Sequence, residues 1–486
     1  MDDSLRKLIK GLSASEKRYF RLYAQRSGDG ANHLALFEVL VKDPSVTDND
    51  VRQRHKSEKW AANLPVTKNH LKHQILDALV HFGRENGYRN TIEHGIRKAT
   101  MLHDHGCTAD AVELLNKLEK RAADGLFWSS ALQAVQSLKA IQYGDGIDIN
   151  RQLLAREQQY LNYMLNESAY YTLIRELLNI RLGSGSVRSE AERACLDELR
   201  HHALVSDMEL AVTPIAKYYF HTFWGICHSL LSDSDASEQS YLWSLQLARD
   251  VPALAAGRIK DYFSRMNSYI SKLSAKGFTP EFTDWMNELR AAPATPMFRD
   301  LEHVKELTTV YASNHELQAY FHEHSFVQGA KRADELWAEV TAAFEPVKEP
   351  FRLVFLYNGM VLHVMAGEYQ TSKRWIRAIL EMPGEASMLT RQLASLLNII
   401  VRYELGDLEL VESLLRSQKR DAQGLGSATA QRLFKHYGEL LRADSSESKK
   451  LWVNLETDFS ELCQKPEEKP LFALFDFGAW TKRFKV

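Results

Sequence analysis

Residues 366–376 read AGEYQTSKRWI, and this stretch decides the fold that the sequence predicts. Gly367 stands between two apolar segments, and Trp375 and Ile376 follow it by eight and nine residues. Glycine is typical of the residue that ends a helix, because its backbone adopts the left-handed conformation of a C-cap without steric cost. The stretch therefore predicts a helix, a tight turn at Gly367 and a second helix.

The same pattern recurs with a period of 39 residues. Gly406 follows Gly367 by 39 residues, and the same step backwards reaches Gln328 as the expected turn. Four columns of apolar or small residues coincide around these turns: Phe321/Met360/Ile399 seven before, Ala333/Ser372/Val411 five after, and Leu336/Trp375/Leu414 with Trp337/Ile376/Leu415 eight and nine after. A small residue lets the second helix approach the first, and bulky residues one turn later fill the space between hairpins.

An independent match surrounds Gly106. Its matching positions are Ala99, Ala111, Leu114 and Leu115. A weaker candidate at residues 232–245 fits the columns poorly, so it is left out of the predicted array.

This pattern resembles tetratricopeptide-like (TPR-like) helical repeats, in which a small residue follows the turn, a bulky residue comes four later and the helix pairs are antiparallel. The resemblance covers residues 314–420 and 91–122, with a period of 39 in place of about 34 and without a proline closing each repeat. It implies helical hairpins stacked as a right-handed TPR-like α-solenoid. The opening SEKRYFRLYA and the closing LFALFDFGAW are also similar to those of uncharacterised bacterial helical proteins of comparable length, which implies no activity.

The composition supports an all-α fold. The chain has 486 residues, of which 45% are hydrophobic, and only 12 Pro and 24 Gly are available to break helices. Clusters of breakers separate segments of roughly 15–40 residues, which is the length of helices and helical hairpins. A chain of this length forms several domains or an elongated array of units.

Charge and cysteine content narrow the functional classes. The formal net charge of −2 gives the whole chain no electrostatic signature of nucleic-acid or membrane binding. The four cysteines form no CxxC spacing, which argues against structural zinc and disulfides and favours a reducing compartment. The N-terminus has no apolar signal-peptide core, and the most apolar run, residues 353–366, is too short to span a bilayer. We therefore expect a cytoplasmic protein without a membrane segment.

The predicted organisation has four parts. They are residues 1–90, an N-terminal helical module; 91–310, divergent helical hairpins; 311–463, TPR-like repeats with a period of about 39; and 464–486, an aromatic C-terminal cap helix. The last part gathers seven large apolar side chains between Leu471 and Phe484, which either seal the last hairpin or dock into a partner. Whether residues 125–310 continue the array stays open.

The first 90 residues contain several helix signals. Ser13 and Glu16 have the spacing of a capping box, which predicts a helix beginning near Ala14. Three further helices are expected at residues 31–42, 47–58 and 65–86, the last starting with Pro65 where its missing amide costs little.

Basic residues on these helices give the module two interpretations. They are Lys17, Arg18, Arg21, Lys68 and Lys72. In one interpretation the module binds nucleic acid, and the helix at 65–86 directs Thr67, Asn69 and His70 towards bases. In the other it is a solvated cap of the repeat array, because terminal units have one face in water.

Catalytic and metal-binding motifs are absent from the sequence. It contains no P-loop, dinucleotide fingerprint, nucleophile elbow, HExxH or EF-hand pattern. The histidine groups are interpreted as packing or surface residues rather than as ligands: His70/His73, His103/His105 and His315/His322/His324. We therefore expect no enzymatic activity, no cofactor and no metal.

The predicted function is non-catalytic binding of a protein or peptide partner on an extended concave surface. The first helix of each hairpin usually lines that surface, so the expected contact residues are Tyr320, Tyr357, Asn358 and Arg402. The alternative is a regulator in which the N-terminal module binds nucleic acid and the repeats sense a ligand.

Overall fold

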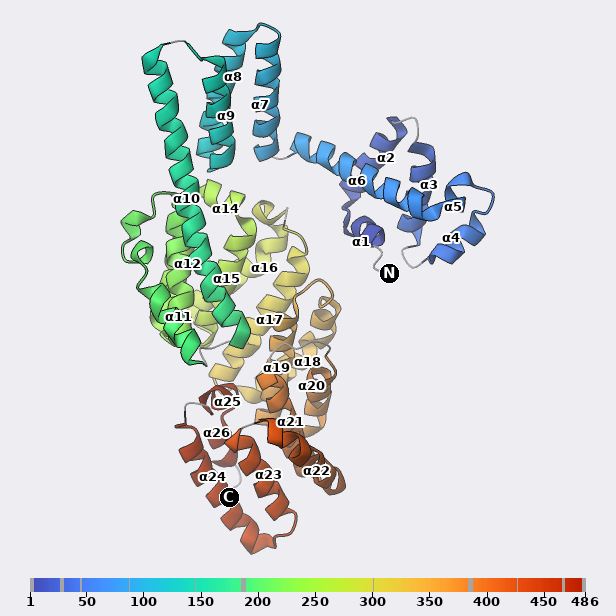
Figure 1. Cartoon of the computed structure of the whole chain (residues 1–486). Helices are drawn as coiled ribbons and strands as arrows, with labels where there is room; N and C mark the ends of the chain where they lie inside the picture. The colour runs from blue at the N-terminus through green and yellow to red at the C-terminus, as the bar shows by residue number, and fades with distance from the viewer. Residues whose placement is uncertain are drawn as a thin grey trace. The chain divides into compact units, whose positions relative to one another are not determined.

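The computed structural model describes residues 4–26, 30–43, 46–86, 88–144, 146–184, 189–299, 301–382, 388–425, 427–465 and 468–482. These residues form 26 α-helices and four 3₁₀ helices, and they contain no strand (Figure 1). The predicted all-α class is thus confirmed. None of the described helices combines the length and the hydrophobicity that crossing a bilayer requires.

The chain divides into two compact units, Met1–Met164 and Leu165–Val486, and the division falls within helix α10. The first unit contains α1 (Ser4–Gly11), α2 (Ala14–Arg26), α3 (Gly30–Lys42), α4 (Asp48–Arg54), α5 (Lys59–Ala62), α6 (Leu64–Asn86), α7 (Tyr88–Asp104), α8 (Thr108–Asp124), α9 (Trp128–Ile141) and the start of α10 (Ile147–Ser184). Its buried residues form two hydrophobic clusters, one contributed by α1–α6 and one by α7–α10. The four-part division expected from the sequence stays a prediction.

The predicted start of α2 is confirmed. The backbone N–H of Ser13 donates to Glu16 Oε2 at 2.7 Å, and the N–H of Glu16 donates to Ser13 Oγ at 3.2 Å. The single helix expected at 47–58 is wrong, because α4 ends at Arg54 and a turn precedes the short α5. Trp60 of α5, which follows that turn, lies in the core and is 5% exposed.

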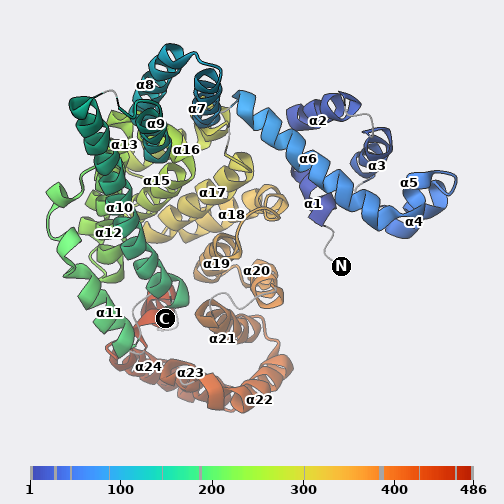
Figure 2. The ribbon, with the colours of Figure 1, turned by 45° about the horizontal axis from the view of Figure 1, so that its top comes forward.

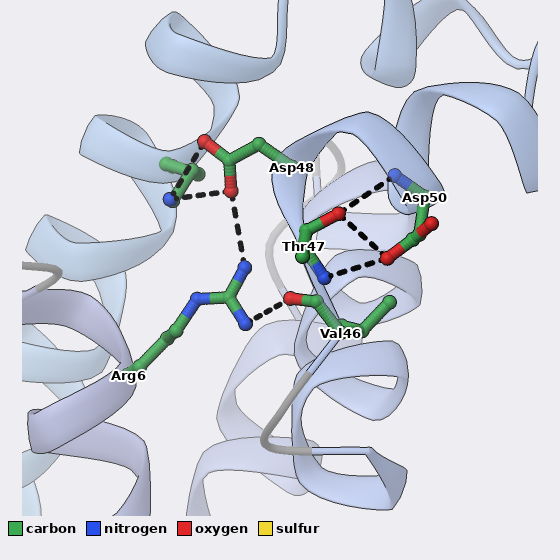
Figure 3. A network of polar contacts seen from close by, with 6 residues as sticks. Arg6, Val46, Thr47, Asp48 and Asp50 are labelled. Carbon is green, nitrogen blue, oxygen red and sulfur yellow. Dashed lines mark hydrogen bonds and ion pairs between the residues drawn. The ribbon is translucent and has the colours of Figure 1, made fainter.

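A polar network joins three helices of the first unit (Figure 3). Arg6 of α1 donates to the Val46 carbonyl and, at 3.0 Å, to Asp48 at the start of α4. Lys68 of α6 donates to the same carboxylate at 3.0 Å. Burial alone would raise the pKa of Asp48, but Lys68 and Arg6 lower it overall. Thr47 completes a capping box with Asp50, so α4 is held at its first turn.

The second unit contains the rest of α10 and the helices that follow it. They are α11 (Glu190–Arg200), α12 (Pro214–Leu230), α13 (Ser234–Asp250), α14 (Pro252–Gly257), α15 (Ile259–Ser274), α16 (Pro280–Ala291), α17 (Val304–His322), α18 (Phe326–Ala342), α19 (Glu349–Ala366), α20 (Tyr369–Glu381), α21 (Met388–Glu404), α22 (Leu408–Leu425), α23 (Ala428–Leu440), α24 (Ser445–Leu462), α25 (Lys469–Leu474) and α26 (Phe477–Thr481).

Successive helices from α17 to α22 pack against one another in chain order (Figure 2). In addition, α17 packs on α19 and α19 packs on α21. The first helix of each pair therefore contacts the first helix of the next pair.

Gly367 and Gly406 end helices as predicted. Their φ angles are +79° and +78°, in the left-handed region that glycine tolerates. After each glycine, the next backbone N–H donates back into the ended helix at 2.9 Å, from Glu368 to the His363 carbonyl and from Asp407 to the Arg402 carbonyl. This is the bonding of a Schellman C-cap.

The turn expected at Gln328 is wrong. The left-handed residue is His324, with a φ of +55°, and Gln328 lies inside α18. The difference arises because α18 has 17 residues whereas α20 has 13. Four residues are about one helical turn, so the register that is wrong by four residues still points to the buried face of α18. Ala333 is fully buried, and Gly329, five residues after the true turn, is also buried.

The segment left out of the predicted array forms the same kind of hairpin. Ser232 has a φ of +63°, and the Asp233 N–H donates to the His228 carbonyl at 2.9 Å, which ends α12. Five residues after the turn, the fully buried Ser237 donates from Oγ to the Gly225 carbonyl at 2.7 Å.

The aromatic C-terminal segment forms two short helices rather than the one expected. Phe475 is extended, and Asp476 starts α26 by accepting from the Ala479 N–H at 2.8 Å. Phe475, Phe477 and Trp480 are 0% exposed, and the segment packs on α21 and α24. Phe484 lies outside the described residues.

Candidate functional site

Two of the four residues expected to contact a partner are held inside the second unit. The Tyr357 hydroxyl donates to the Leu474 carbonyl at 2.5 Å, and burial raises its pKa. Asn358 is 6% exposed and donates to the Asn314 carbonyl at 3.2 Å. Both side chains therefore serve internal packing.

The other two expected contact residues are half-buried. The ring of Tyr320 lies 4.7 Å from that of Phe278. Arg402 lines a groove of about 730 Å³, a size suited to a peptide side chain or a small ligand.

This groove, which we call the α20 groove, is formed by side chains of α18, α20 and α21. Its lining residues are Trp337, Lys373, Arg374, Ile376, Arg377, Ala378, Leu380, Glu381, Asn398 and Arg402. Four of them are cationic and one is a carboxylate, so the lining carries an excess of positive charge.

The cations of the α20 groove differ in whether they form ion pairs and in how exposed those pairs are. Lys373 forms no ion pair with any residue that the structure describes. Arg377 donates to Glu381 at 2.7 Å, but both side chains are mostly exposed, and such surface pairs contribute only ~0–1 kcal/mol. Arg402 donates to Asp407 at 2.9 Å. An incoming carboxylate can therefore recruit Lys373 and compete for Arg377 at low cost.

The apolar part of the groove is aromatic. The Arg374 guanidinium lies 4.2 Å from the centre of the Trp337 ring, a cation–π contact that fixes both groups. Leu380 is 39% exposed beside them. The groove thus offers an aromatic face and an aliphatic side chain among cationic groups.

The cations on α20 were not among the contact residues expected from the sequence. Partner contacts were expected on the first helix of each hairpin, whereas Lys373, Arg374 and Arg377 lie on a second helix. The signal was present in the sequence: Lys373 and Arg374 lie in the stretch 366–376, and Arg377 follows it directly. These residues at i, i+1 and i+4 share the polar side of an amphipathic helix.

The basic residues of the first unit are largely engaged. Arg21 donates to Glu38 at 2.6 Å, Lys68 donates to Asp48 at 3.0 Å, and Lys72 donates to Ser4 at 3.1 Å. Lys17 is half-buried and Arg18 is exposed. Thr67, expected to face bases, is 8% exposed and donates to the Trp60 carbonyl at 2.9 Å. Asn69 and His70 are exposed.

A second pocket, of about 430 Å³, lies between α10 and α11 and contains Cys195, Glu176, Glu198 and His202. Burial and the two carboxylates raise the pKa of the Cys195 thiol. A thiol in that setting stays protonated and is a weak nucleophile.

The histidine groups of the sequence behave differently from one another. His315 is 4% exposed, its Nε2 lies 2.8 Å from Asn267 Oδ1, and burial lowers its pKa to about 3. His103 Nδ1 lies 3.2 Å from the Thr108 hydroxyl on the surface. His70 packs its ring 5.8 Å from that of His33.

One histidine outside the groups named from the sequence lies beside two carboxylates. His363 of α19 is fully buried, with Asp334 of α18 and Glu368 at the start of α20 around its Nε2. All three ligand atoms lie within 4.8 Å of one another. The functional assignment depends on such geometry, because no family model, curated protein or solved structure matches the chain.

Proposed function

We propose that the chain is a non-catalytic, TPR-like helical-repeat scaffold that binds an acidic segment of a protein partner in the α20 groove. The packing of α17 on α19 and of α19 on α21 supports hairpins stacked as an α-solenoid. In such an array, a groove between neighbouring hairpins presents a continuous edge to an extended peptide.

The observation that carries this proposal is the chemistry of the groove lining. Lys373, Arg374, Arg377 and Arg402 line the groove together with one carboxylate, Glu381, and with Trp337. Arginine and aromatic side chains dominate the energy of protein interfaces, and a cationic lining attracts carboxylates. An acidic peptide with one large apolar residue satisfies both features.

The test measures binding of a labelled, Glu-rich peptide containing one aromatic residue, by fluorescence anisotropy with the full chain. We expect saturable binding that weakens with salt and that falls about 5- to 20-fold in the double variant Lys373→Gln/Arg377→Gln. Lys435→Gln is the matched control, because Lys435 of α23 is 71% exposed and lies outside the groove lining. Equal binding by the wild type, the double variant and the control would refute the proposal.

The alternative, a nucleic-acid-binding N-terminal module with a repeat sensor, stays a hypothesis. Its test is retention of the full chain on DNA at increasing salt. Loss of retention in Lys17→Gln/Arg18→Gln, but not in the groove variant, would favour the alternative over the peptide scaffold.

A further inference from the structure

His363 has an imidazole nitrogen that lacks a hydrogen-bond partner among the described residues. Its Nδ1 lies 2.7 Å from the Gly359 carbonyl, and because a carbonyl only accepts, Nδ1 carries the proton. In the neutral ring, Nε2 then presents a lone pair. Nε2 is buried and makes no hydrogen bond to any described residue.

The lone pair of Nε2 faces negative charge. Asp334 Oδ1 lies 3.3 Å away and Glu368 Oε2 lies 3.8 Å away. Three electron-rich atoms at close range repel one another. Arg374 offsets part of the charge at Asp334 Oδ1, and a cation among the three atoms would offset the rest. The two separations exceed those of a charge-assisted hydrogen bond, ~2.7–2.9 Å, but approach the ~3.3–3.6 Å edge of a tetrahedron with metal–ligand bonds of ~2.0–2.2 Å.

Neighbouring groups orient these three ligands. The Gly359 carbonyl fixes the His363 ring, which also packs 5.5 Å from the ring of Trp375. Arg374 donates to Asp334 Oδ1 at 2.5 Å, and a carboxylate oxygen has a further lone pair for an ion. Ligands in protein metal sites are commonly fixed by such hydrogen bonds to their remaining atoms.

The cluster is also open to ions from solvent. The side chains of Asp334 and Glu368 are 38% and 40% exposed, while His363 is buried beneath them. One nitrogen and two carboxylate oxygens leave a fourth tetrahedral position for water.

We propose that Asp334, His363 and Glu368 bind one divalent transition-metal ion, with Zn²⁺ as the probe. Asp334 belongs to α18, His363 belongs to α19, and Glu368 directly precedes α20. The ion therefore links the hairpin α17–α18 to the hairpin α19–α20. The proposed metal binding does not depend on the proposed peptide binding. Arg374 is common to both regions, because it donates to Asp334 and also lines the α20 groove.

The experiment titrates Zn²⁺ into the full chain after chelator treatment, with calorimetry for stoichiometry and thermal unfolding for stability. The variants Glu368→Gln and Asp334→Asn remove one ligand charge each while preserving shape, and both positions are partly exposed, so the fold tolerates them. Glu339→Gln, at an exposed position of the same helix α18, is the control. Because the chain has 18 histidines, the readout is the difference between wild type and variant rather than total zinc.

We expect the wild type and Glu339→Gln to bind one Zn²⁺ more than either ligand variant, or to bind it at least tenfold more tightly. The Tm of the wild type should rise with Zn²⁺ by ~2 °C or more, whereas that of Glu368→Gln should not. Co²⁺ should give the visible absorption of a four-coordinate site in the wild type and in Glu339→Gln, but not in Glu368→Gln or Asp334→Asn. Equal binding and equal Tm responses in all four proteins would overturn the proposal, as would a wild type whose stability responds to pH through His363 but not to Zn²⁺.

Discussion

The indole ring of Trp375 packs against the backbone of Gly359 so closely that a methyl group on Gly359 would lie 2.2 Å from the ring. The same relationship holds in another hairpin, where a methyl group on Gly225 would lie 2.4 Å from the Tyr241 ring. In both pairs the glycine is on the first helix and the aromatic residue on the second. The missing side chain therefore makes room for the ring that fills the hairpin.

Gly359→Ala is expected to destabilise the second unit by about 2 kcal/mol, because the overpacking penalty exceeds the helix-propensity gain of alanine. Gly438→Ala is the control, since Gly438 lies in α23 and, outside the backbone of that helix and the two chain neighbours, no described atom would lie within 4 Å of an added methyl group. There the propensity term acts alone and should stabilise the chain by ~0.5–1 kcal/mol. Urea unfolding measures both variants, and a stabilising effect of Gly359→Ala would contradict the packing argument.

Gly367→Ala should cost about 1–2 kcal/mol, because the φ of +79° places an alanine side chain against the following carbonyl. Apart from Gly367 and its two chain neighbours, no described atom lies within 4 Å of the added methyl group, so the penalty comes from the local backbone alone. Gly367→Asn should cost clearly less, since asparagine tolerates the left-handed conformation. Equal thermal midpoints for the two variants would argue against this origin.

The positions of the hairpin turns could be predicted from the sequence where the turn requires glycine. At Gly367 and Gly406 the left-handed backbone selects that residue, so the turn is visible in the sequence. At Ser232 and His324 the chain adopts the same conformation with other residues. Both are exposed, and the backbone N–H that follows each one donates back into the ended helix, as it does after the two glycines. The length of α18 could not be predicted from the sequence either, because an extra helical turn leaves the pattern of buried residues on its face unchanged.

The candidate sites were harder to predict than the fold. The cations of α20 can be read from the sequence, but their grouping with Trp337 depends on how α18 and α20 pack. His363 and Glu368 flank one turn, whereas Asp334 reaches them from another hairpin. The spacing of residues in the sequence does not predict that Asp334 lies close to His363 and Glu368.

Tyr357→Phe should loosen the C-terminal segment. The Tyr357 hydroxyl donates to the Leu474 carbonyl, 117 residues further along the chain, and loss of a buried hydrogen bond costs about 1 kcal/mol. We expect faster amide hydrogen exchange in residues 468–482, with little change in α12 and α13. Tyr143→Phe is the control, because Tyr143 is 89% exposed. Unchanged exchange in the C-terminal segment would show that its aromatic packing suffices without this bond.

Glu404 of α21 gives the second unit a pH dependence that can be separated from the rest of the chain. Its Oε1 makes no hydrogen bond to a described residue, and burial raises the pKa of the carboxyl from 4.5 to about 7. Tyr437 lies near enough for the Glu404 charge to raise the tyrosine pKa as well, after burial as the larger cause. The folded chain thus keeps Glu404 protonated in a range where the unfolded chain ionises it.

The stability that the protonated Glu404 provides is therefore fully present below about pH 4.5 and is lost as the pH rises to about 7. Glutamine has the same shape and stays neutral, so Glu404→Gln should match the wild type near pH 4. At pH 8 it should be more stable by about 2 kcal/mol, a value reduced from the full shift because the group is partly exposed to solvent. Urea unfolding at the two pH values measures this difference, with Glu409→Gln on the exposed face of α22 as the control. A stability difference between Glu404→Gln and the wild type that does not change with pH would mean that the carboxyl is already ionised in the folded chain.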